Sequence, residues 1–384
     1  MVGRVIVAGA LALAVTASPV AVASASARVA APECAPDRGS LTTGAAPWAQ
    51  QRIDIKSAWR LTMGEGTTIA VIDSGVDVSH PQLKIAGKAD FSRTDHRDCT
   101  GHGTAVAGIV GAQYQEGAPF HGVAPAARIL SLKHTNARTG DLAHLVEAIR
   151  YAARIKVDVM NISVQARDQP DLKAAIDYAL AQDIVVVAAA GNVDKEDGTP
   201  GPAYPAAYEG VLSVGALAPD GGVAMFSNVD SKVSVVAPGE GLTSTWPGRT
   251  YHNDLPGTSF AAPYVTGVAA LVRSRFPGMT QAQIRRRIEV TADGAIGEGS
   301  GGGVINPLYA VTAVLPDEQV VVAPPRAAPL PPSAVTKVTP PDERAIAVSL
   351  AVGGGALALA AAMVVGRVVR SANGGRGRRP AHRT

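Results

Sequence analysis

Charged, aromatic and cysteine residues are all scarce in this chain. Asp, Glu, Lys and Arg make up 17% of its 384 residues, aromatic residues make up 4%, and only two cysteines are present. The small formal net charge of +3 argues against a nucleic-acid-binding surface on the main domain. Two cysteines are too few to form a zinc site by themselves, and acidic clusters of the calcium-binding kind are not evident. We therefore expect no metal, no other cofactor and no nucleic-acid partner.

Two hydrophobic segments frame the chain. Residues 1–27 combine a basic residue, a short apolar stretch and a small-residue end, which is typical of a secretory signal peptide cleaved after Ala27 or, alternatively, Ala25. A membrane anchor is the other interpretation, but the apolar stretch is short for one. Residues 345–366 carry no charge and are long enough to span a bilayer. A buried core helix is the alternative there, and the proline-rich stretch before the segment argues against it.

The charge distribution sets the expected orientation. The last eighteen residues, from Arg367 on, hold six arginines and no acidic residue. Basic residues beside a membrane span favour the cytoplasmic side. We therefore expect a single-pass protein of the cell membrane, with residues 367–384 in the cytoplasm and the region between the two segments outside.

Between these segments, continuously apolar runs alternate with helical patterns. Strands are expected at residues 67–74, 127–134, 157–163, 183–191, 211–216 and 233–239. Helices are expected at 102–112, 141–154, 170–182, from Ser259 onward and at 280–292, the last opening with a Thr-x-x-Gln capping box. The alternation predicts an α/β fold, a doubly wound and mostly parallel sheet with helices on both faces. The expected boundaries are an extension at 28–47, a folded domain at 48–315 and a proline-rich spacer at 316–344.

Polar residues of particular kinds stand where these elements begin or end. Asp73 ends the first strand, His102 stands between two glycines at a helix start, Asn192 follows a strand, and Ser259 opens a helix. Each has an ordinary explanation: a turn cap, a surface histidine, a turn asparagine and a helix cap. Together they supply an orienting acid, a base, an amide donor and a nucleophile, in the chain order Asp, His, Ser.

On these residues the chain resembles the subtilisin-like serine peptidases. The segments "VIDSGVDVSHPQL", "GHGTAVAGIVG" and "LPGTSFAAPYVTGVAALV" are similar to that family's Asp, His and Ser motifs, and "AAAGN" to its oxyanion-asparagine motif. The resemblance implies that Asp73 orients His102, that His102 activates Ser259, and that Asn192 stabilises the oxyanion together with the Ser259 backbone N–H.

The layout is also similar to the mycosins, membrane-anchored subtilases that accompany type VII secretion. The supporting features are "DCTGHGT", "YPAAYEGVLSVGAL", a cysteine in the N-terminal extension, the spacer, the single span and the basic tail. In an exported protein Cys34 and Cys99 are expected to pair, with two free thiols as the alternative.

Two features depart from the usual subtilase pattern. Where subtilases commonly carry a Ser-x-Gly-Gly segment along the substrate cleft, this chain has Ser163, Val164, Gln165 and Ala166. We expect the first three of these to contact substrate and the missing glycine to narrow the substrate range. The extension at 28–47 is too short for a folded pro-domain, so it either straps the domain or partly covers the cleft, and we favour the strap.

The sequence therefore predicts a membrane-anchored serine endopeptidase that cleaves a narrow set of exported proteins and is associated with type VII secretion. The alternative is a structural component that stabilises a secretion membrane complex, with proteolysis secondary. Protein substrates, and possible contact with that secretion complex, are the expected partners.

Overall fold

The computed structural model describes residues 34–41, 47–137, 140–193, 201–316, 318 and 343–374. The predicted signal peptide at 1–27, most of the spacer at 316–344 and the end of the tail lie outside the described residues. The chain divides into two units, Met1–Arg326 and Ala327–Thr384, and each is considered by itself.

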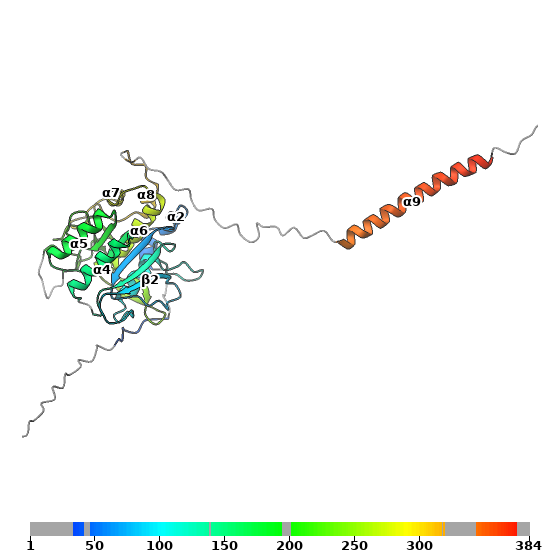
Figure 1. The fold of residues 1–384 in the computed structure, drawn as a ribbon. Helices are drawn as coiled ribbons and strands as arrows, with labels where there is room; N and C mark the ends of the chain where they lie inside the picture. The colour runs from blue at the N-terminus through cyan, green and yellow to red at the C-terminus, as the bar shows by residue number, and fades with distance from the viewer. Residues whose placement is uncertain are drawn as a thin grey trace, which may run out of the picture. The chain divides into compact units, whose positions relative to one another are not determined.

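The first unit alternates strands and helices along most of its length (Figure 1). Its helices are α1 (Trp48–Arg52), α2 (Ile55–Trp59), α3 (His102–Gly111), α4 (Leu142–Arg154), α5 (Pro170–Ala181), α6 (Thr258–Arg275), α7 (Gln281–Val290) and α8 (Pro307–Thr312). Its strands are β1 (Thr68–Asp73), β2 (Ile85–Asp90), β3 (Arg128–Lys133), β4 (Val159–Ile162), β5 (Val185–Ala189), β6 (Leu212–Leu217), β7 (Val235–Pro238), β8 (Leu242–Trp246) and β9 (Thr250–Leu255).

Seven of the strands form one sheet in the order β2-β3-β1-β4-β5-β6-β7, and every neighbouring pair is parallel. Strands β8 and β9 form a separate antiparallel hairpin. The α/β prediction with a parallel sheet is therefore confirmed. Because β1, β4 and β5 are parallel neighbours, their carboxyl ends lie side by side at one edge of the sheet. The strand order changes direction at β1, and folds of this kind place their sites at the carboxyl ends of the strands near such a change.

Alternate strand residues face two hydrophobic cores. On β1, Ile69 and Val71 pack into the core shared with α3 and α6, whereas Ala70 and Ile72 pack into the core shared with α4 and α5. Figure 1 shows the green helices α4 and α5 beside the sheet. Helix α6 is buried along nearly its whole length and packs against β4, β5, β6 and β7. Its first turn is therefore fixed rigidly against the sheet.

The observed helix and strand boundaries lie within two residues of the predicted ones. The strands end where their backbone hydrogen bonds to the neighbouring strands end. The capping box is confirmed: Thr280 accepts from the Gln283 N–H, and the Gln283 side chain accepts from the Thr280 N–H. The sequence patterns missed β2, the β8–β9 hairpin and the short helices α1, α2 and α8.

The N-terminal extension lies against the hairpin. Cys34 and Cys99 form a disulfide, which confirms their pairing. Ser40 and Tyr251 of β9 exchange two backbone hydrogen bonds of 2.7 Å, and the Trp246 indole N–H donates to the Asp37 carbonyl at 2.7 Å. Residues 34–41 are thus fastened at three points along the hairpin and the loop before α3, as a strap would be.

A second group of contacts holds the C-terminal end of the first unit in place. The Arg287 side chain of α7 is fully buried, and its Nε donates to the Ala310 carbonyl at 2.6 Å. Its other nitrogens donate to the Ala313 carbonyl and to the buried carboxylate of Glu318. The guanidinium also lies 4.3 Å from the centre of the Phe276 ring. This group, the Arg287 clasp, holds the chain after α8 against α7.

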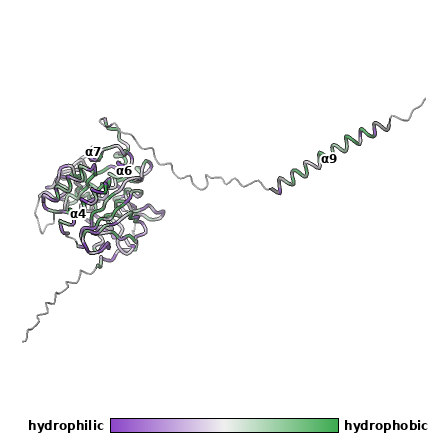
Figure 2. The backbone as a smooth tube through the Cα atoms, in the orientation of Figure 1, coloured by the Kyte–Doolittle hydropathy of each residue, from purple (hydrophilic) through white to green (hydrophobic). Residues whose placement is uncertain are grey.

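The described residues of the second unit, 343–374, form helix α9 (Glu343–Gly374). The segment Ala347–Arg370, whose most apolar window has a mean hydropathy of 2.2, is long and apolar enough to cross a bilayer. Figure 2 shows hydrophobic residues along most of the length of α9. The helix runs beyond residue 366, the predicted end of the span.

Removal of the disulfide should destabilise the first unit. The two cysteines are separated by 65 residues, and closing a loop of that length contributes roughly 4 kcal/mol by chain entropy. The double variant Cys34→Ser with Cys99→Ser should therefore unfold at a clearly lower urea concentration. The wild-type protein in reductant is the matched control, and unchanged midpoints in both would contradict the prediction.

Candidate active site

The acid and the histidine lie at the carboxyl end of β1. Asp73 is 4% exposed, and its Oδ1 lies 2.8 Å from the Nδ1 of His102. The same oxygen accepts from the Ser74 N–H at 2.7 Å. Burial alone would raise the pKa of Asp73, but the charge and hydrogen bond of His102, with the Ser74 N–H, hold that pKa below its usual range. The carboxylate therefore stays ionised beside the imidazole.

Glycines on both sides of His102 allow close approaches that no other residue permits. Gly101 has φ +80°, and a Cβ there would lie 2.2 Å from the Trp246 ring of β8. A Cβ at Gly103 would lie 2.1 Å from the Gly75 carbonyl oxygen. The first turn of α3 is thus pressed between the hairpin and the turn after β1, and this places His102 beside Asp73.

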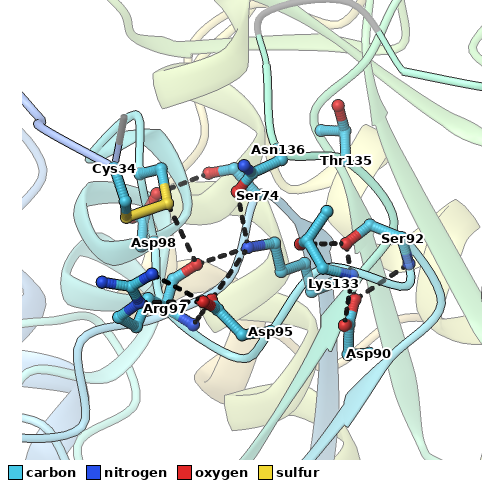
Figure 3. Close-up of polar contacts among 12 residues, drawn as sticks. Cys34, Ser74, Asp90, Ser92, Asp95, Arg97, Asp98, Lys133, Thr135 and Asn136 are labelled. Atoms are coloured by element: carbon cyan, nitrogen blue, oxygen red, sulfur yellow. Dashed lines mark hydrogen bonds and ion pairs between the residues drawn. A yellow bond between two sulfur atoms is a disulfide. The ribbon is translucent and has the colours of Figure 1, made fainter. Parts of the chain in front are cut away.

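A second buried carboxylate, Asp98, holds this turn in place (Figure 3). Its Oδ1 accepts from the Ser74 hydroxyl and the Gly101 N–H, both at 2.9 Å. Its Oδ2 accepts from the Thr104 N–H at 2.8 Å and from the Thr104 hydroxyl at 2.6 Å. Asp98 therefore satisfies N–H groups at the start of α3 and ties that helix to Ser74, which itself bonds Asp73.

Lys133 supports the loop before α3 from the sheet (Figure 3). It is paired in register with Asp73 across β1 and β3, and its side chain is 1% exposed. Its Nζ donates to the Arg97 carbonyl and, at 2.8 Å, to the Asn136 side chain. Burial lowers the pKa of Lys133, against the opposing effect of nearby carboxylates led by Asp95. The loop that carries Cys99 is thereby held against the strand next to Asp73.

Ser259 is the second residue of α6. The helix is preceded by Gly257, with φ +141°, and no side chain of its own caps it, so Ser259 is not a helix cap. The Ser163 hydroxyl donates to the Ser259 carbonyl at 2.8 Å and accepts from Asn161, which in turn accepts from Thr266. The neighbouring Phe260 ring packs on the His102 ring, with centroids 4.9 Å apart. This ring contact joins the first turn of α6 to the first turn of α3.

Asn192 joins this group from the turn after β5. Its Oδ1 accepts from both the N–H and the hydroxyl of Thr258, each at 3.0 Å. The side-chain carbonyl is thus fixed, and the Asn192 Nδ2 lies 3.7 Å from where a Cβ of Gly257 would stand. An amide donor is therefore held beside the first turn of α6.

The four predicted residues come together from four different elements. Of the predicted substrate-contacting residues, Ser163 supports Ser259, Val164 packs partly into the core with α4 and α5, and Gln165 is exposed and bonds the Asn192 backbone.

Sequence reasoning missed Asp98 and Lys133. An Asp shortly before a helix start was the available signal for Asp98, whereas nothing in the sequence distinguished Lys133. Within the described ranges, no three His, Cys, Asp or Glu residues are grouped so that they could hold a metal ion.

A parallel sheet with an Asp–His pair and a serine helix at its carboxyl edge defines a subtilisin-like protein. The sequence profile of the Subtilase family matches residues 64–315, and the chain belongs to that family.

Three relatives illustrate the range of similarity. Subtilisin NAT of Bacillus subtilis subsp. natto is 40% identical over 234 residues, which cover 60% of this chain and 61% of that protein. Mycosin-1 of Mycolicibacterium smegmatis is 33% identical over 386 aligned positions, which cover 85% of this chain and 84% of mycosin-1. The crystal structure of MycP1 from the ESX-1 type VII secretion system superposes with a TM-score of 0.68 at 32% identity, covering 77% of this chain and 92% of that one.

A further histidine, His134, directly follows β3 and is 3% exposed, and its backbone N–H donates to the backbone carbonyl of Asp73 at 2.9 Å. Among the residues that the structure describes, neither ring nitrogen of His134 has a hydrogen-bond partner. Burial lowers its pKa from 6.5 to about 4, with Asp73 opposing this shift and His102 and His144 adding to it. The imidazole is therefore neutral in the folded protein at pH 7.

Folding stability should fall between pH 6.5 and pH 4 because of His134. In that interval the unfolded chain binds a proton that the folded chain does not, so acid favours unfolding. The shift corresponds to roughly 3 kcal/mol. His134→Leu should reduce the loss of unfolding free energy between pH 7 and pH 4 by about that amount, measured by urea denaturation. Between pH 7 and pH 8 the two proteins should change in parallel, and equal losses in acid would refute the assignment.

Proposed function

We propose that this chain is a serine endopeptidase in which Asp73, His102 and Ser259 form the catalytic triad. Asp73 holds His102 through Nδ1 and so fixes the tautomer in which Nε2 is the basic nitrogen. His102 takes the Ser259 proton as the hydroxyl attacks a peptide carbonyl, and then delivers that proton to the leaving amine. Asn192 and the Ser259 N–H donate to the oxyanion of the tetrahedral intermediate.

One observation carries the proposal: the 2.8 Å contact between His102 Nδ1 and a buried, ionised Asp73, with the His102 ring packed on Phe260, which follows Ser259 at the start of α6. A capping serine or a surface histidine would not need a buried carboxylate, which costs free energy unless it is paired. Family membership supports the same chemistry.

The substrates we propose are a narrow set of exported proteins. Similarity along most of the chain to mycosin-1, and to a structure described as part of a type VII secretion system, supports a link to such a system. Helix α9 supports a membrane anchor. We place the peptidase unit outside the cell membrane and the basic tail in the cytoplasm, on the charge distribution alone.

A scaffold role in a secretion complex is the second candidate. The candidate span and the similarity to mycosin-1 along both chains favour it, because neither feature is needed for peptide hydrolysis alone. The state of the active site distinguishes the two: an assembled and accessible triad favours chemistry, whereas a folded but unreactive site favours a scaffold.

Covalent labelling tests the proposal directly. Membranes that contain the full-length chain should react with a fluorophosphonate probe at Ser259, because only an activated serine attacks this phosphorus. The Ser259→Ala variant is the control and should give no labelled band. A correctly folded wild-type protein that is not labelled would refute an open, assembled triad.

Asn192→Ala should lower kcat by about 10²- to 10³-fold, the magnitude established for loss of one oxyanion donor in subtilisin. The variant also loses the acceptor for Thr258, so Asn192→Asp is the matched control, since it keeps that acceptor but removes the donor. Steady-state peptide hydrolysis should show a large loss in both variants. A loss confined to Asn192→Ala would mean that Asn192 anchors α6 and does not stabilise the oxyanion.

A further inference from the structure

Trp246, the last residue of β8, connects the N-terminal extension to the start of helix α3. The residue is 5% exposed, and its indole N–H donates to the Asp37 carbonyl at 2.7 Å. A buried indole N–H needs an acceptor. Here the acceptor belongs to residues 34–41, the strap, and not to the hairpin that carries the tryptophan. The orientation of the ring therefore depends on the strap.

The Trp246 ring covers Gly101, the residue directly before His102. A Cβ on Gly101 would overlap three carbon atoms of the indole, the nearest of them 2.2 Å away. The ring also packs on the His252 ring of β9, with centroids 4.6 Å apart. Because the indole is rigid and enclosed, it limits where the Gly101 backbone can lie.

Gly101 needs such a limit because glycine restricts its own backbone least. It has φ +80° and directly precedes the first turn of α3. Its N–H donates to Asp98 at 2.9 Å, and its carbonyl accepts from the Ala105 N–H at 3.0 Å. The Trp246 ring adds packing on its Cα. Without the ring the turn could shift while both hydrogen bonds were kept, and His102 would move with it.

The body of α3 is attached to β8 independently of Trp246. The Ser244 hydroxyl donates to the Ala105 carbonyl at 2.7 Å, and the Thr245 hydroxyl donates to the Thr104 carbonyl at 2.8 Å. These bonds would keep the helix against the hairpin if the ring were removed. A change at Trp246 should therefore loosen the first turn of α3 without releasing the helix.

The strap reaches the same turn by a second route. Cys34 is joined by the disulfide to Cys99, two residues before Gly101, and Asp37 lies three residues after Cys34. The covalent route and the route through Trp246 thus converge on Gly101.

We propose that Trp246 is a positioning residue for His102: its ring, oriented by the strap, holds the first turn of α3 where the imidazole meets Asp73. This inference rests on the serine peptidase mechanism proposed above. The strap then contributes to the reactivity of the active site as well as to the stability of the fold.

The experiment measures the rate constant for reaction with a fluorophosphonate as a function of pH, on the full-length protein in detergent. The rate constant describes only folded molecules, whereas the labelled amount reports how much protein has folded. Trp246→Leu should react at least about tenfold more slowly than wild type, because a small displacement of the base is costly. The pH of half-maximal rate should also fall by about half a unit, because an imidazole farther from a carboxylate loses its proton more readily.

Trp59→Leu is the matched control. Trp59 is also a tryptophan whose indole N–H donates to a backbone carbonyl, that of Val123 at 2.8 Å. It lies in α2, however, and packs on the rings of Tyr114 and His121. This variant should unfold more easily than wild type but keep the wild-type rate constant and pH dependence.

Replacement of Trp246 by benzothienylalanine isolates the bond to the strap, because this residue keeps both rings and has sulfur in place of the N–H. Its rate constant should fall between those of wild type and Trp246→Leu.

A double variant tests the contact with Gly101. The methyl group of Gly101→Ala would overlap the indole, so this variant alone should react slowly. Gly101→Ala combined with Trp246→Leu gives the methyl group room. The combined loss should therefore be about tenfold smaller than the product of the two single losses.

The outcomes separate this inference from the proposed function. No reaction of wild type would mean that the serine peptidase proposal has failed, and this inference with it. Reaction of wild type with an unchanged rate and pH dependence in Trp246→Leu would overturn the positioning role alone, as would single losses that simply multiply in the double variant. An equal loss in Trp59→Leu would assign the effect to general destabilisation. A wild-type rate with benzothienylalanine would overturn the contribution of the strap.

Discussion

The buried charge at the end of β1 constrains much of the surrounding structure. Asp73 is almost fully removed from water, so its carboxylate needs partners that offset the lost hydration. His102 and the Ser74 N–H supply them at 2.8 and 2.7 Å. Both partners depend on their own supports, since Ser74 and the start of α3 are joined through Asp98. A shift of any one of these groups would leave a buried carboxylate without its partner, so the loop, the helix and the strand are fixed together.

The sequence was most informative where one local pattern determined the outcome. Continuously apolar strands identified most of the sheet. The two glycines beside His102 are visible in the sequence, and the structure makes close approaches there to Trp246 and Gly75. Strands β2 and β9 were missed because they lie at exposed edges and their residues are largely half-buried or exposed, so the apolar signal is weak. The helices α1, α2 and α8 were missed because they are too short for a helical period to be recognised in the sequence.

Side-chain roles that depend on tertiary approach could not be predicted. Nothing in the sequence distinguished Lys133, and the position of Asp98 shortly before a helix start did not indicate that its side chain is buried; both residues are buried in the folded unit. The segment after β4 was recognised as unusual because it lacks glycine. The direction of the Gln165 side chain, however, depends on the register between β4 and β5, which the sequence does not specify.

The Arg287 clasp has a consequence for how force would enter the folded unit. It engages Ala310 within α8, and Ala313 and Glu318 just after that helix. Tension arriving from the C-terminal side of the chain would meet the bonds to Glu318 and Ala313 before it reached α8 or the sheet. They converge on one fully buried guanidinium that also packs on Phe276, so the load would be shared among several bonds and passed to α7. The carboxyl edge of the sheet, where Asp73 and His102 meet, would thereby be shielded from pulling forces on the chain that follows Glu318.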